Sequence, residues 1–237
     1  MKHFKLRTDL TKQFSGITLY RIELTIDCKW GKVGDLGGYI EKEANLGNAW
    51  VSDNAWVSDN AQVSGNAQVS GNAQVSGDAW VSGDAWVSDN ARVSDNARVS
   101  GDAQVSGNAR VSGNARVSGN ARVSGNARVS DNARVYGDAQ VSGNAQVSGN
   151  ARVYGDAQVL LTMTTKSSSD LISIVGFKFS ITINSGFIII GCKQYTSLKD
   201  FLSKYEADGK VNNYSDYDLA YLKATVISTI KLLKKVK

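Results

Sequence analysis

The stretch ARVSGNARVSGN at residues 115–126 repeats one six-residue unit, and the same unit fills the middle of the chain. Val recurs at every sixth position from Val51 to Val159, and an Ala precedes each of these valines by two residues. The pattern runs from about Asn48 without an insertion. Residues at i and i+2 point to the same side of an extended strand, whereas no helix places residues six apart on one side. The repeat therefore predicts short β-strands with Ala and Val turned inward.

The two residues before each Ala predict a sharp corner between these strands. They are Gly-Asn, Asp-Asn or Gly-Asp in every unit, and all three residue types tolerate the left-handed backbone region. Asp-Asp never occurs, although each position separately accepts Asp. Repulsion between like charges gives one reason for this, and duplication of the repeat in the gene gives another.

Units such as Val117-Ser118-Gly119-Asn120-Ala121-Arg122 carry a resemblance to the hexapeptide-repeat, left-handed parallel β-helix superfamily. The resemblance covers about 112 residues and implies triangular coils of 18 residues, so about six coils and a rod roughly 30 Å long at ~4.8 Å per coil. Tyr136 and Tyr154 replace the usual Ser and lie 18 residues apart, so we expect their rings to stack. The expected fold is mainly β, a β-solenoid with an N-terminal β cap and a small C-terminal α+β (βββαα) module.

The residue between Ala and Val points outward, and a coil of 18 residues sorts these residues into three columns. Two columns are rich in Arg, and Trp is confined to the N-terminal half of the rod. We expect the arginine columns to form an anion-binding or partner-binding surface with the tryptophans as its anchors, and the tryptophans to contact the N-terminal segment or another subunit. Its members are Trp50, Trp56, Trp80, Trp86, Arg92, Arg98, Arg110, Arg116, Arg128, Arg134, Arg152, Tyr136 and Tyr154. The alternative is a solvated cover of the strands, since ten Asp residues offset eight Arg residues in the rod.

The composition changes at both ends of the repeat, which predicts four segments. These are an N-terminal cap (1–47), the solenoid (48–160), a polar linker (161–169) and a C-terminal module (170–237). In the cap, residues 17–22 alternate as a strand and residues 34–40 lead into the first coil. Both end segments also resemble hexapeptide-repeat proteins that are common in bacteriophage genomes and are often labelled acyltransferase-like.

The C-terminal module predicts three strands followed by two helices. The strands are expected at 170–175, 177–183 and 187–192, with a hairpin turn at 184–186. Thr196 or Ser197 caps the first helix, which Gly209 ends, and the second helix begins near Ser215.

The residue types that catalysis on this fold requires are missing from the repeat. Acyltransferases of the superfamily use a histidine base, and its carbonic anhydrases use three histidines for zinc, whereas this chain has only His3, outside the repeat. Stacked corner acids such as Asp84 and Asp102 suggest a cation site, but Asp is also a common turn former. We therefore predict no catalytic residues, no metal site and no cofactor.

Composition narrows the partners and the compartment. The chain has no run of about 18 apolar residues and no signal-peptide core, so we expect a cytoplasmic protein without a membrane partner, in the host cytoplasm if phage-encoded. The basic excess lies outside the rod, which disfavours a nucleic-acid partner. We expect a non-enzymatic, phage-encoded scaffold or protein-binding protein that binds a protein or itself, as a dimer or trimer. The alternatives are a phage inhibitor of a host defence factor and a degenerate acyltransferase.

Overall fold

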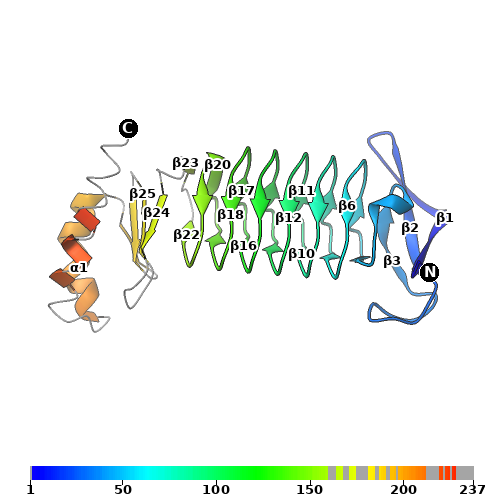
Figure 1. Cartoon of the computed structure of the whole chain (residues 1–237), viewed down its shortest axis with the longest axis horizontal. Helices are drawn as coiled ribbons and strands as arrows, with labels where there is room; N and C mark the ends of the chain where they lie inside the picture. The colour runs from blue at the N-terminus through cyan, green and yellow to red at the C-terminus, as the bar shows by residue number, and fades with distance from the viewer. Residues whose placement is uncertain are drawn as a thin grey trace.

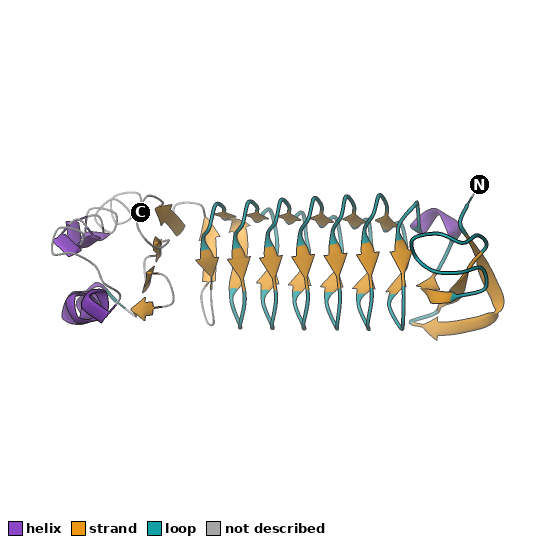
Figure 2. Cartoon of the chain, turned by 90° about the horizontal axis from the view of Figure 1, so that it is seen from below, coloured by secondary structure: helices purple, strands orange, loops and turns teal. Residues whose placement is uncertain are grey.

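The computed structural model describes residues 2–159, 164–167, 171–174, 181–184, 187–190, 193–195, 197–211, 219–220, 222–224 and 226–227. It shows a straight rod of stacked coils with a β cap at the N-terminal end (Figure 1). A small sheet and the helix α1 lie at the other end of the rod (Figure 1). Seen from a second direction, the strands of successive coils line up into continuous rows along the rod (Figure 2).

The rod has three faces, and each is a sheet of parallel strands in which a strand pairs with the strand 18 residues later. The first face consists of β4 (Trp50–Val51), β7 (Gln68–Val69), β10 (Trp86–Val87), β13 (Gln104–Val105), β16 (Arg122–Val123), β19 (Gln140–Val141) and β22 (Gln158–Val159). The second face contains β5 (Trp56–Val57), β8 (Gln74–Val75), β11 (Arg92–Val93), β14 (Arg110–Val111), β17 (Arg128–Val129) and β20 (Gln146–Asn150). The third face contains β6 (Gln62–Val63), β9 (Trp80–Val81), β12 (Arg98–Val99), β15 (Arg116–Val117), β18 (Arg134–Val135) and β21 (Arg152–Val153).

This arrangement confirms the β-solenoid, the 18-residue coil and the three predicted columns. The rod has about seven turns, however, where the sequence predicted about six. One reason is β23 (Thr164–Ser167), which pairs in parallel with β20 and so extends the second face into the segment predicted to be a linker. The hand of the coil stays a prediction drawn from the resemblance.

The core of the rod is a thin column of alanine and valine. Every repeat valine from Val51 to Val159 is fully buried, and the repeat alanines are buried with them. Backbone bonds join each coil to the next: the Arg110 N–H donates to the Ala127 carbonyl at 2.9 Å, and the same bond recurs along each face. The complete absence of proline suits this ladder, because proline lacks the N–H donor.

The corners confirm that the residue after Ser adopts the left-handed conformation. Gly occupies this position in most units, and Asp occupies it in five, with φ between 57° and 60°. The side chain of each such Asp accepts a hydrogen bond from the backbone N–H of the glycine one coil further on, as Asp89 does from Gly107 at 2.9 Å. Aspartate is thus accommodated where glycine is otherwise required.

The N-terminal cap is a small antiparallel extension of the second face. It comprises β1 (Phe4–Phe14), β2 (Ile17–Leu24), β3 (Leu36–Ile40) and the 3₁₀ turn η1 (Glu43–Asn45), with β3 pairing in parallel with β5. The sequence predicted a strand matching β2 and a lead into the first coil at residues 34–40, where β3 lies. It predicted no strand at β1, since the basic and polar residues of β1 obscure the alternation. Leu19, Ile22 and Leu24 of β2 are fully buried, and Ile22 and Leu24 belong to the same buried cluster as the core of the rod.

The C-terminal module contains an antiparallel sheet and a helix. The sheet consists of β24 (Leu171–Ile174), β25 (Ile181–Asn184), β26 (Phe187–Ile190) and β27 (Lys193–Tyr195). The predicted hairpin joins β25 to β26, while β27 was not predicted. The helix α1 (Leu198–Val211) is capped by the Ser197 hydroxyl, which accepts the Asp200 N–H at 3.0 Å, and it continues past Gly209, where the sequence placed its end.

The second predicted helix is described only in part. Residues 219–220, 222–224 and 226–227 are helical, whereas its predicted start near Ser215 and the predicted strand residues 177–180 lie outside the described residues. Several apolar side chains of the module form a buried cluster separate from that of the rod. Its members are Ile183, Ile188, Tyr195, Phe201, Tyr205, Leu219, Leu222 and Val226.

Candidate interaction faces of the rod

Two of the four tryptophans predicted to lie on the rod surface are buried, which corrects their place in the candidate surface. Trp50 is 8% exposed and Trp56 is 6% exposed, because the N-terminal cap covers the first coil. The Phe14 ring packs against Trp56 with ring centres 4.7 Å apart, and the His3 ring lies 6.1 Å from Trp50. These two residues therefore anchor the cap, which is the predicted contact with the N-terminal segment.

Trp80 and Trp86 remain on the surface, at 44% and 49% exposure. The Trp80 indole N–H donates to the Ser64 hydroxyl at 3.2 Å, and Trp86 makes the equivalent bond to Ser70 at 3.1 Å. These bonds hold each indole along the rod toward the preceding coil. Trp80 belongs to the third face, where the Arg98 guanidinium lies 5.8 Å from its ring centre, and Trp86 belongs to the first face.

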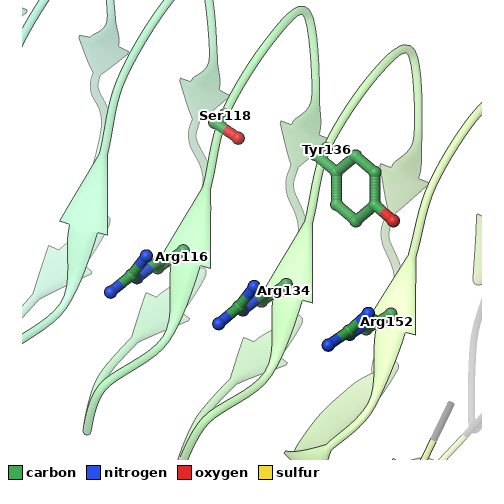
Figure 3. Close-up of a pocket in the computed structure, with 5 residues that line it drawn as sticks. All are labelled: Arg116, Ser118, Arg134, Tyr136 and Arg152. Atoms are coloured by element: carbon green, nitrogen blue, oxygen red, sulfur yellow. The ribbon is translucent and has the colours of Figure 1, made fainter.

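The arginines form exposed ladders on two faces. Arg92, Arg110 and Arg128 stack on the second face, and Arg98, Arg116, Arg134 and Arg152 stack on the third. Figure 3 shows the last three guanidinium groups side by side and pointing in the same direction. Among the described residues, none of the ladder arginines has a carboxylate within 4.0 Å. Stacked like charges without partners are unfavourable, so a ligand or partner with negative charge would stabilise both faces.

Each arginine ladder borders a shallow groove. The groove on the third face has a volume of about 290 Å³ and is lined by Arg116, Ser118, Arg134, Tyr136 and Arg152 (Figure 3). The groove on the second face is lined by Arg110, Ser112, Arg128, Ser130, Gln146 and Ser148. Both grooves present N–H and O–H donors, which suits recognition of oxyanions or carboxylates.

The two tyrosines stack as predicted. The Tyr136 and Tyr154 rings lie 5.5 Å apart at an interplanar angle of 16°, and both remain partly exposed. They lie on the third face beside the arginine ladder, since Tyr136 follows Arg134 by two residues.

The next corner along the chain carries the acidic edge, which consists of Asp84, Asp102, Asp138 and Asp156. All four residues are exposed, and none lies within 4.0 Å of a described lysine or arginine side-chain nitrogen. Their carboxylates repeat from coil to coil within the pairs Asp84–Asp102 and Asp138–Asp156. Within the described part of the chain, no three His, Cys, Asp or Glu side chains are placed to hold a metal ion.

The single histidine is part of the cap. The His3 Nε2 atom lies 3.1 Å from the Ala49 carbonyl oxygen and can donate to it, and the ring is 8% exposed. Burial lowers the pKa of His3; the hydrogen bond to Ala49 opposes this shift and the charge of Lys29 adds to it. His3 therefore satisfies a carbonyl group of the first coil, and the neutral ring is the form that the site favours.

The fold and its exposed side chains define a class of protein: a capped parallel β-solenoid whose accessible features are extended ladders of charged and aromatic residues. Residues 55–158 match the family described as Bactofilin: Polymer-forming cytoskeletal. The match covers most of the rod but less than half of the chain, and it leaves out both ends. It supports the predicted β-helix superfamily but not the narrower likeness to acyltransferase-like proteins.

A search of curated proteins found no match. None of the helices in the described segments combines the length and the apolar character that crossing a bilayer requires.

Proposed function

We propose that this chain is a non-enzymatic structural protein that associates with itself. The observation that carries the proposal is the match between residues 55–158 and a family described as polymer-forming and cytoskeletal. The matched segment lies within the uninterrupted rod, which offers long regular sides for assembly.

The N-terminal end of the rod is poorly suited to adding another chain by β-pairing. The cap ends in the edge strand β1, which carries Lys5, Arg7, Asp9 and Lys12 and has a register break between Arg7 and Thr11. Charged residues and irregular pairing are features that protect edge strands from further pairing. Self-association therefore involves the sides of the rod or its other end.

Concentration-dependent assembly tests this proposal. We expect the full chain to sediment faster as its concentration rises, and to form elongated particles in negative-stain electron microscopy. The dissociation should be reversible on dilution, which separates assembly from aggregation. A chain that stays monomeric over the whole accessible concentration range would overturn the proposal.

A second function, binding to a host protein, is supported by the exposure of Trp80 and Trp86. Phage origin and a host factor as partner stay predictions that rest on the resemblance of the end segments. A pull-down from host lysate should then lose the partner in the Trp80→Ala and Trp86→Ala variants. Equal capture by the wild-type chain and by both variants would contradict a tryptophan interface.

A further inference from the structure

The third face gathers most of the features that mark an interface. Four large aromatic side chains of the rod are substantially exposed, and three of them, Trp80, Tyr136 and Tyr154, lie on this face. The same face carries the longest arginine ladder, with four members. The acidic edge runs along one border of the same face.

These features have a fixed order across the face. In one coil, Arg134 is followed by Tyr136 and then by Asp138, and the next coil repeats the order with Arg152, Tyr154 and Asp156. The positive column therefore lies at the middle of the strand, the tyrosine column lies beside it, and the negative column lies at the corner. Figure 3 shows Tyr136 displaced to one side of the arginine row, on the same surface.

We propose that a second copy of this chain packs its third face against the third face of the first copy. The two rods run parallel, and a two-fold axis that lies between them and is parallel to both relates one copy to the other. Such an axis keeps each coil at its height but reverses the order of the columns across the face. The arginine column of each rod then meets the acidic edge of the other, and the tyrosines lie near the axis. The resulting pairs are Arg98 with Asp102, Arg134 with Asp138 and Arg152 with Asp156, each formed twice, while Arg116 faces Asn120.

Antiparallel rods do not give this pairing. Antiparallel packing of the two third faces requires a two-fold axis that lies in the plane of the interface and is perpendicular to the rods. Such an axis reverses the direction of the second rod and places each column opposite the same column of its partner. Arginine would then face arginine and aspartate would face aspartate, which is unfavourable. The charge pattern therefore selects the parallel arrangement.

A second copy also matches the spacing of the charges better than other extended anions. The arginine ladder repeats once per coil, at ~4.8 Å, and the acidic edge has the same spacing except at Asn120, so the charges of two parallel rods stay in register from coil to coil. Acidic residues on one side of an extended peptide repeat at about 6.6 Å, and phosphates along one strand of a DNA duplex repeat at about 3.4 Å. This inference rests on the proposed function, because it names the surface and the partner for self-association.

Crosslinking at the two-fold axis tests the geometry. Ser118 lies in the tyrosine column of the third face, and Ser112 occupies the equivalent position of the second face in the same coil. Facing sheets pack ~10 Å apart, within reach of a short bis-maleimide. With Cys28 and Cys192 replaced by Ser in both variants, Ser118→Cys should give a crosslinked dimer and Ser112→Cys should not. Equal crosslinking of the two variants, or none in either, would overturn the proposal.

A charge exchange tests the ion pairs. Arg134→Asp places two carboxylates opposite each other twice per dimer, so the dissociation constant in sedimentation equilibrium should rise at least about tenfold. Adding Asp138→Arg to the same chain restores both pairs across the axis and should restore most of the affinity. Arg128→Asp makes the same charge change on the second face and should leave the dissociation constant unchanged. Failure of the double variant to recover would contradict the pairing.

The two proposals fail in different ways. If the Ser118→Cys variant assembles without forming a crosslink, the face pairing is overturned and self-association stands. A chain that is monomeric throughout would overturn both. Binding of inorganic polyphosphate or single-stranded RNA by the monomer, lost in Arg134→Asp and without dimer formation, would identify a polyanion as the occupant and overturn the pairing as well.

Discussion

Five aspartates occupy a backbone conformation that usually belongs to glycine. In the left-handed region an L-residue costs roughly 1–2 kcal/mol more than glycine. Each of these aspartates offsets part of this strain, because its carboxylate accepts the N–H of the glycine one coil further on at 2.9–3.0 Å. At all five positions the residue one coil further on is Gly, and no Asp in this conformation stacks directly on another. Whether Asp is tolerated at a corner therefore depends on the residue at the same corner of the adjacent coils as well as on the corner conformation.

This rule predicts different outcomes for two apparently equal substitutions. Gly125 has glycine one coil before it and one coil after it, so the carboxylate of Gly125→Asp should accept the Gly143 N–H as the five aspartates accept theirs. The free energy of unfolding should fall only by the part of the ~1–2 kcal/mol left-handed cost that this hydrogen bond does not offset. Gly71 lies between Asp53 and Asp89, and Gly71→Asp should lower this free energy by about 1 kcal/mol more, through repulsion. Urea denaturation followed by circular dichroism measures both, and equal losses would contradict the rule.

At the scale of elements, the N-terminal cap depends on one buried titratable residue. The pKa of His3 is lowered by burial, so the folded cap favours the neutral ring. An unfolded His3 regains its ordinary pKa of about 6.5 and binds a proton more readily. The stabilising contribution of the neutral ring is therefore complete above about pH 6.5 and decreases as the pH falls from there toward the lowered pKa.

We expect the cap to loosen on acidification from about pH 7.5 to about pH 5. Its detachment exposes Trp50 and Trp56, so the tryptophan fluorescence should shift to longer wavelength in the wild-type chain. His3→Gln keeps an N–H donor for the Ala49 carbonyl but does not titrate, and its fluorescence should be much less sensitive over the same range. The same shift in both chains would show that another group controls the cap.

A ladder of asparagine side chains supports the corner between the first and second faces. Asn90 donates to Asn108 at 3.2 Å, and Asn108 donates to Asn126 at 3.1 Å. Asn108→Ala removes both bonds and should lower the free energy of unfolding by about 1 kcal/mol, since the groups are exposed. Asn96 occupies the same position of its unit without a ladder bond among the described residues, so Asn96→Ala should cost less. A larger loss for Asn96→Ala would contradict the ladder's contribution.

At the scale of the whole molecule, the period of the repeat determines most of what could be predicted. The buried valines, the corner conformation, the columns and the stack of Tyr136 on Tyr154 all follow from local spacing alone. The burial of Trp50 and Trp56 could not be predicted in this way. Each lies between Ala and Val, as Trp86 does, and the difference is contact with residues about 40 positions earlier in the chain.

The failures at the ends have a similar cause. Strand β1 has charged residues on its open edge, so its alternation is weak, and the pairing with β2 is what holds it. Helix α1 continues through Gly209 because a glycine ends a helix only when the fold does not favour another turn. The proposed role of the arginine ladder in pairing two rods depends on contacts with a second molecule, so the repeat pattern of one chain could not predict it.

Two deletions should distinguish the stability of the rod from the arrangement of outward-facing side chains in columns on its three faces. Removing residues 115–132 takes out one complete coil, so every later strand stays on its own face. Removing residues 115–120 takes out one unit, and every later strand moves to the neighbouring face. Both shortened rods should keep a β-type circular dichroism spectrum, whereas only the first should keep the dimer in sedimentation equilibrium. Loss of folding in the first variant would contradict the coil as an independent unit.

The stack of interchangeable coils also has a consequence for heredity. Slippage during replication of so repetitive a gene adds or removes whole units, and the valine core accepts any number of them. The outer columns stay intact only when units are gained or lost in multiples of three, because three units make one complete coil. Descendants of this rod should therefore vary in length mainly by complete coils wherever the outside is under selection, and by single units wherever it is not.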